Sequence, residues 1–178
     1  EIRPLTEGVV SDYGILERML QYFISKSMGH GKFLKPRIVI CVPGGVTDIE
    51  RRAMEEATYR AGAREAAIVK GPVVAAMGAG IDVMRPNGNM VVDIGGGITE
   101  IASLSMGGIV VSQTLKTAGD AFNEAIVRYT AETFGLYIDR KTAEKLKTEI
   151  GSTHFRGEPL TRKEVKGRDI DAGFPRRV

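Results

Sequence analysis

Three consecutive glycines, Gly95, Gly96 and Gly97, interrupt an apolar stretch near the middle of the sequence. Residues 90–94 are typical of a short buried strand before the glycines, and residues 98–106 of a second strand after them. Because a strand follows, the dipole of a helix N-terminus is not available there to bind an anion. The bare backbone N–H groups can form an anion site instead, since no Cβ keeps phosphate oxygens away. The pattern therefore predicts a phosphate-binding bend.

Two oxygen-bearing side chains flank this bend. Asp93, at the end of the first strand, could hold a metal-bound water, and the hydroxyl of Thr99 could reach the terminal phosphate of a nucleotide. The alternative is a glycine-rich hairpin with a β-bulge and no ligand, and the pattern alone leaves both interpretations open. Gly107 and Gly108 then turn the chain into a third strand over residues 109–117.

The composition is that of an ordinary globular protein. Of the 178 residues, 43% are hydrophobic and 26% are charged, so disorder is not expected. The net charge of +3 comes without a basic stripe interleaved with aromatic residues, so nucleic acid is not an expected partner. No apolar run approaches the ~20 residues of a membrane span. The single cysteine, Cys41, lies in an apolar stretch and is expected to be buried and unpaired.

The first half of the chain alternates strand and helix signals. Such an order predicts parallel strands with helices on the faces of the sheet, and the three strands around the glycines would add an antiparallel portion to give a mixed sheet. The expected elements are a helix from Ser11 or Asp12 to about residue 27, a strand at 37–42, a helix from the Thr47–Glu50 capping box to Gly62, a strand at 65–69 and a helix beginning at Pro72.

The second half contains two further helix signals and a weaker tail. In the last helix, Glu144 and Lys147 lie three residues apart and project together, which by default indicates a solvated ion pair. The tail, residues 151–178, is richer in charge and has few strand-like positions. The expected elements are a helix over 121–134 capped by Gly119-Asp120, and a helix over 141–150 capped by Asp139 that buries Ala143, Leu146 and Ile150.

A loop over residues 28–36 carries two apolar residues, Phe33 and Leu34, between Lys32 and Lys35. Apolar residues with basic neighbours form a small anchor for a bilayer surface. The alternative is a loop whose apolar residues fold back onto the core. The sequence pattern does not separate these two interpretations.

Several segments in collinear order resemble the MreB family of bacterial actin homologues, the rod shape-determining proteins. The resemblance extends over almost the whole chain, so it is more specific than a single motif. The matching segments are residues 40–43, 61–65, 78–80, 91–101, 118–120, 142–152 and 165–170.

The resemblance implies an α/β chain with the actin/Hsp70-type ATPase fold, in which two α/β domains clamp ATP and Mg²⁺ between them. Residues 1–85 would be the remainder of the first domain, residues 86–150 the core of the second, and residues 151–178 the start of its smaller outer lobe. The family's first phosphate loop would precede Glu1 and its final adenine loop would follow Val178, so we expect a fragment with half of the clamp.

The resemblance also implies roles for individual residues. Asp93 would orient the magnesium shell through water, the three glycines with Thr99 would form the second phosphate loop, and Thr99 would position water or phosphate. Glu144 and Lys147 would contact the ribose and adenine. The full set of implied nucleotide-binding residues is Asp93, Gly95, Gly96, Gly97, Thr99, Gly119, Glu144, Lys145, Leu146 and Lys147.

One departure from the family pattern concerns catalysis. The family usually has a glutamate directly before the proline at position 72, and this glutamate polarises the attacking water. Here Lys70 and Gly71 precede Pro72, and neither supplies a carboxylate. We therefore expect slowed ATP hydrolysis, or a scaffold that binds ATP without hydrolysing it.

By resemblance, the function is that of a filament-forming cytoskeletal protein that binds ATP, organises cell-wall synthesis and maintains rod shape. It would be cytoplasmic and peripheral on the inner membrane face, with Phe33 and Leu34 in the membrane-contacting loop. Its partners would be further copies of itself, the membrane surface and the cell-wall elongation machinery. The alternatives are a degenerate paralogue that acts as a non-hydrolysing binding module, or a sugar or acid kinase or chaperone ATPase of the same superfamily.

Overall fold

The computed structural model describes residues 5–6, 9–10, 12–29, 35–153 and 161–178. The chain divides into two compact units, Glu1–Lys116 and Thr117–Val178. The division into residues 1–85, 86–150 and 151–178 that the family resemblance implies stays a prediction.

The first unit begins with a two-residue antiparallel pair, β1 (Leu5–Thr6) and β2 (Val9–Val10), and then helix α1 (Tyr13–Met28). The predicted cap is confirmed, because the Asp12 carboxylate accepts a hydrogen bond from the backbone N–H of Ile15 at 2.9 Å. This bond satisfies one of the free N–H groups at the helix start.

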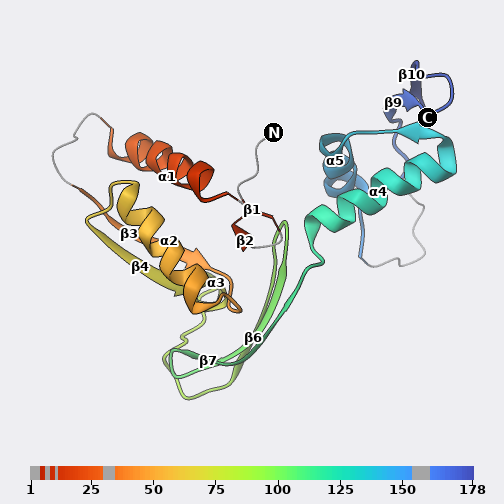
Figure 1. The fold of residues 1–178 in the computed structure, drawn as a ribbon. Coiled ribbons are helices and arrows are strands. Elements are labelled where there is room, and N and C mark those ends of the chain that lie inside the picture. Colours follow the sequence, from red (N-terminus) through yellow and green to blue (C-terminus); the bar gives the residue numbers. More distant parts are fainter. Residues whose placement is uncertain (1–4, 7–8, 11, 30–34, 154–160) are drawn as a thin grey trace. The chain divides into compact units, whose positions relative to one another are not determined.

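Strands β3 (Arg37–Val42) and β4 (Glu65–Lys70) pair in parallel, and helix α2 (Asp48–Arg60) connects them. The Thr47–Glu50 capping box is present in both directions, so the predicted strand–helix–strand unit is confirmed. Helix α2 packs along β4 and contacts α1 (Figure 1). Cys41 is exposed, so its predicted burial is wrong. Side chains alternate along β3, and Cys41 is on the face of the strand pair that no other described element covers.

Helix α3 (Gly71–Gly78) starts with Pro72 in its first turn, as predicted. Strands β5 (Asn89–Ile94), β6 (Thr99–Ser105) and β7 (Gly108–Leu115) follow as an antiparallel meander (Figure 1). The parallel pair and the antiparallel meander are both present as expected. Within the described residues their hydrogen bonds form two separate sheets rather than the one mixed sheet that was predicted. One face of the meander packs on α3 and the following loop through Ala76, Val83, Ala102 and Leu104.

The second unit holds α4 (Gly119–Phe134) and α5 (Arg140–Ile150) against a three-stranded antiparallel sheet of β8 (Leu136–Tyr137), β9 (Lys166–Asp169) and β10 (Pro175–Arg177). Asp139 caps α5 as predicted, and its carboxylate accepts from Thr142 N–H at 2.8 Å. The N-cap of α4 is Ala118 rather than the predicted Gly119-Asp120, and no side chain accepts a capping bond there. The core of this unit consists of Leu136, Ile138, Ala143, Leu146 and Val165.

The candidate membrane residues Phe33 and Leu34 lie outside the described residues. Among the residues that are described, no helix combines the length and apolar character needed to cross a bilayer.

Strand β9 approaches β8 so closely at Gly167 that a side chain would not fit. A Cβ placed there would lie 2.8 Å from Leu136 Cγ and closer still to the carbonyl oxygen of Tyr137. We expect Gly167→Ala to lower the free energy of unfolding of the second unit by about 1–3 kcal/mol, because backbone must move to admit the methyl group.

The matched control is Gly78→Ala in α3, where an added Cβ meets no atom within 4 Å. This change should alter stability by less than about 1 kcal/mol. Hydrogen exchange of the amides in β8 and β9 measures the loss of stability in the second unit. Unchanged protection in Gly167→Ala would contradict the close approach.

Candidate functional site

The glycine bend connects β5 and β6 and is open to solvent. Asp93, Gly95 and Gly96 are exposed, and Gly95 N–H donates to the carbonyl oxygen of Ile98 at 2.9 Å. A Cβ placed on Gly96 would meet no atom within 4 Å. In this described bend, no glycine has a positive φ, so the backbone conformation does not require glycine. At Gly96 the missing Cβ leaves the backbone open to approach, whereas a Cβ on Gly95 would lie 3.2 Å from the carbonyl oxygen of Ile98.

Three polar side chains form a row on the face of the meander that includes Asp93. Asp93 on β5, Glu100 on β6 and Thr114 on β7 are direct partners in the strand register, so they share one face. Glu100 is 6% exposed, and its carboxylate accepts a hydrogen bond from the backbone N–H of Gly44 at 2.5 Å. This face therefore meets the loop that follows β3.

Position 71, where the family resemblance implies a catalytic glutamate, lies beside the same carboxylate. Gly71 is the first residue of α3, and a Cβ placed on it would lie 3.0 Å from Glu100 Oε2. Lys70, the N-cap residue, is exposed and makes no side-chain capping bond. Sequence reasoning did not identify Glu100 as a site residue.

Thr99 lies on the opposite face of β6 from Glu100, because side chains alternate along a strand. It is buried and is paired in register with Ile94 and Leu115. Thr99 follows the bend as the sequence places it, but its side chain lies on the opposite face of the meander from that of Asp93. Its role in positioning water or phosphate stays a prediction.

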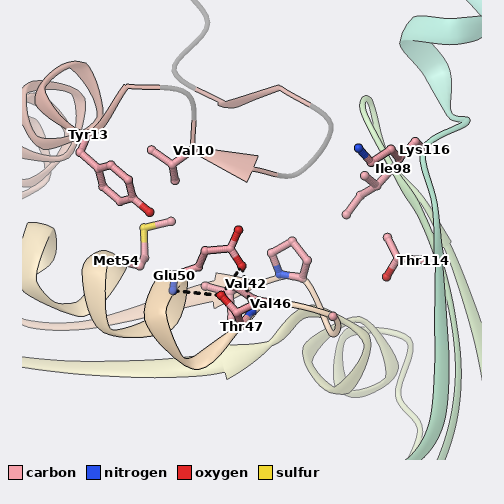
Figure 2. A pocket seen from close by; sticks show the side chains of 12 residues that line it. Val10, Tyr13, Val42, Val46, Thr47, Glu50, Met54, Ile98, Thr114 and Lys116 are labelled. Atoms are coloured by element: carbon pink, nitrogen blue, oxygen red, sulfur yellow. Dashed lines mark hydrogen bonds between the residues drawn. The ribbon is translucent and has the colours of Figure 1, made fainter.

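A cavity of about 330 Å³ lies next to the bend in the first unit. Figure 2 shows Tyr13 from α1 with Glu50 and Met54 from α2 on one side, and Ile98 and Thr114 on the other. The walls are mostly apolar, and Ile98 joins the cavity to the end of the glycine bend. Such a combination of apolar walls and a few polar groups is typical of small-molecule sites.

The nucleotide-binding residues predicted near the ribose and adenine belong to the second unit. Lys147 Nζ lies 2.7 Å from Glu144 Oε2 and donates to the carbonyl oxygen of Gly119 at 3.1 Å. The two hydrogen bonds from Lys147 and Asn123 lower the pKa of Glu144, with Lys147 the larger cause. Lys145 is exposed, whereas the side chain of Leu146 packs in the core.

Asn123 is a further member of this group that sequence reasoning missed. Its Nδ2 donates to Glu144 Oε2 at 2.6 Å, and the residue is 4% exposed. Among the described residues its Oδ1 has no hydrogen-bond partner. The signal was available in the sequence, because Asn123 stands at helical spacing from the apolar residues Ile126 and Val127.

The class of protein follows from the structures that the chain resembles. The chain matches a structure described as the MamK double helical filament with a TM-score of 0.77, 23% identity and coverage of 98% of this chain and 53% of that one. MreB5 of Spiroplasma citri bound to AMPPNP matches with a TM-score of 0.89, 34% identity and coverage of 99% of this chain and 53% of that one. The fold is therefore the predicted actin/Hsp70-type ATPase fold.

The family is shown by sequence. The family model for MreB/Mbl protein matches residues 1–178, and the chain belongs to that family. The cell shape-determining protein MreB of Haemophilus influenzae is 46% identical over 178 residues, which cover 98% of this chain and 50% of the relative. The cell shape-determining protein Mbl of Bacillus cereus is 46% identical over 99% of this chain and 53% of its own length. The chain spans about half the length of these relatives.

The pKa of Glu144 gives a test of the network in the second unit. Because the folded-state pKa is lowered, the two hydrogen bonds stabilise the fold above the ordinary glutamate pKa and are lost as the pH falls through the folded-state pKa. We expect a carboxyl NMR titration to place the Glu144 midpoint below that of an ordinary glutamate. Lys147→Met should raise this midpoint more than Asn123→Leu does, and an unchanged midpoint in both variants would contradict the network.

Proposed function

We propose that the protein containing this chain binds ATP with Mg²⁺ and assembles into actin-like filaments that maintain rod shape. The observation that carries the proposal is the open glycine bend beside Asp93, in a chain of the MreB/Mbl family. The solved MreB5 structures of Spiroplasma citri, one bound to AMPPNP and one to ADP, support nucleotide binding.

In this proposal the phosphates lie on the backbone N–H groups of Gly96 and Gly97, because the Gly95 N–H already donates to the carbonyl oxygen of Ile98. Oxygen ligands suit Mg²⁺, which keeps several waters, so the exposed carboxylate of Asp93 fits a water-mediated contact. When bound, Mg²⁺ neutralises charge on the phosphates. Glu144 and Lys147 in the second unit would contact the ribose and adenine, and Asn123 and Gly119 hold their polar groups in place.

The proposed partners follow from the relatives. The name of the MamK structure describes a filament, and the MreB and Mbl relatives are named cell shape-determining proteins. These names support self-association through repeated, non-closing contacts. We further propose that the protein lies on the inner membrane face, which Phe33 and Leu34 contact. It would act there together with the cell-wall elongation machinery.

The bend provides a direct test of ATP binding. We expect Gly96→Val in the full-length gene product to weaken Mg–ATP binding at least ~10-fold, because branched carbons would occupy the approach to the backbone N–H groups. The fold should tolerate the change, since a Cβ at Gly96 meets no atom within 4 Å.

Gly88→Val is the matched control, because Gly88 also has open space around its Cβ position and lies outside the bend. Equilibrium binding of Mg–ATP and pelleting of polymer on lipid vesicles are measured for the wild type and both variants. Equal binding by all three proteins would exclude the bend as the phosphate site. Failure of the wild type to form polymer with ATP would argue against a filament.

The alternative of a non-hydrolysing paralogue is favoured by one observation, the glycine at position 71. We expect phosphate release to be about 100-fold slower than in a family member that has glutamate directly before this proline, because water positioning contributes on the order of 10²–10⁴. Phosphate release from assembled protein measures this. A rate equal to that of the glutamate-containing relative would refute the expectation, and co-sedimentation only with a partner filament would support the binding-module alternative.

A further inference from the structure

Glu100 is a buried carboxylate without a compensating cation in the part of the chain that the structure describes. It is 6% exposed, and its carboxylate accepts a hydrogen bond from the backbone N–H of Gly44. Burial of a carboxylate without a cation is costly, and one neutral donor compensates only part of that cost. Packing alone therefore does not account for a glutamate at this position.

The carboxylate occupies a space that two glycines leave open. A Cβ on Gly44 would lie 3.2 Å from Glu100 Oε1, and a Cβ on Gly71 would lie 3.0 Å from Oε2. Position 71 is where related proteins are expected to carry the glutamate that polarises the attacking water. The carboxylate of Glu100 thus lies within 3.0 Å of the point where that missing side chain would begin.

Glu100 is also next to the candidate phosphate and magnesium site. It is the direct cross-strand partner of Asp93, so the two side chains are neighbours on one face of the meander. Thr114 follows on the other side in the same row. A carboxylate in this row accepts hydrogen bonds, which is the property that orients a water molecule.

We infer that Glu100 positions the attacking water for ATP hydrolysis, in place of the side chain that Gly71 lacks. This inference rests on the proposed function, because it requires ATP at the bend. The water oxygen forms a bond to the terminal phosphorus, and the bond from that phosphorus to the bridging oxygen breaks. ADP leaves with the bridging oxygen and its electron pair. Phosphate keeps one hydrogen of the water, and the other passes by way of Glu100 to solvent as a proton.

The same geometry makes Gly71 and Glu100 mutually dependent. Glu100 reaches the site from β6, whereas a glutamate at position 71 would extend into it from the start of α3. A Cβ at position 71 would lie 3.0 Å from Oε2, so Gly71→Ala should shift the carboxylate by a few tenths of an ångström and slow phosphate release slightly. Restoring glutamate at position 71 alone would therefore disturb the Glu100–Gly44 contact.

The test is Glu100→Gln in the full-length gene product. The amide oxygen of glutamine can still accept from Gly44 N–H, so the variant keeps the structural contact and removes the negative charge. We expect kcat for phosphate release to fall at least ~10-fold, with little change in KM for ATP, in polymer formation or in the thermal unfolding midpoint. Glu132→Gln on the exposed side of α4 is the matched control and should leave all four quantities unchanged.

The outcomes separate this inference from the proposed function. If the wild type does not bind Mg–ATP, the proposed function fails and this inference fails with it. If the wild type binds and hydrolyses ATP and Glu100→Gln has the same kcat, only this inference is overturned. A lower unfolding midpoint with unchanged kcat would assign Glu100 a purely structural role, and binding without any phosphate release by the wild type would also overturn the inference.

Discussion

The first unit depends on a close contact between strand β6 and two backbone positions that lack side chains. The carboxylate of Glu100 reaches the N–H of Gly44, which is 56 residues away in the sequence, and lies beside the Cα of Gly71. A Cβ at either glycine would lie 3.0–3.2 Å from a carboxylate oxygen, so the carboxylate would have to shift by a few tenths of an ångström to admit it. This contact joins the antiparallel meander to the loop after β3 and to the start of α3.

One face of the meander is apolar at one end of its strands and polar at the other. Ala102 and Leu104 pack with Ala76 and Val83 to form a core, and the row of Asp93, Glu100 and Thr114 continues that face as a polar surface. The polar row is therefore built on strands that the neighbouring core holds in position. A site on rigid strands keeps its geometry better than one on a loop, because the backbone of each strand is fixed by its ladder.

In the second unit, too, packed apolar residues hold a group of polar side chains in position. The core around Ala143 and Leu146 fixes the rotation of α5, so Glu144 and Lys147 project together from another side of the helix. Asn123 from α4 then completes the hydrogen bonds to Glu144. The orientation of Glu144 and Lys147 thus depends on the predicted burial of Ala143 and Leu146.

The sequence by itself determined the local elements. The Asp12 and Asp139 caps, the Thr47–Glu50 capping box, the parallel strand pair and the glycine-linked meander were all predictable, because each depends on neighbouring residues or on a short period. It also determined the family. An apolar run indicated the strand that contains Cys41 and could not indicate which face would be covered, so the burial of Cys41 was predicted wrongly. Only the tertiary structure placed Glu100 between Gly44 and Gly71 and Asn123 against Glu144, because these contacts join residues far apart in sequence and no local periodicity encodes them.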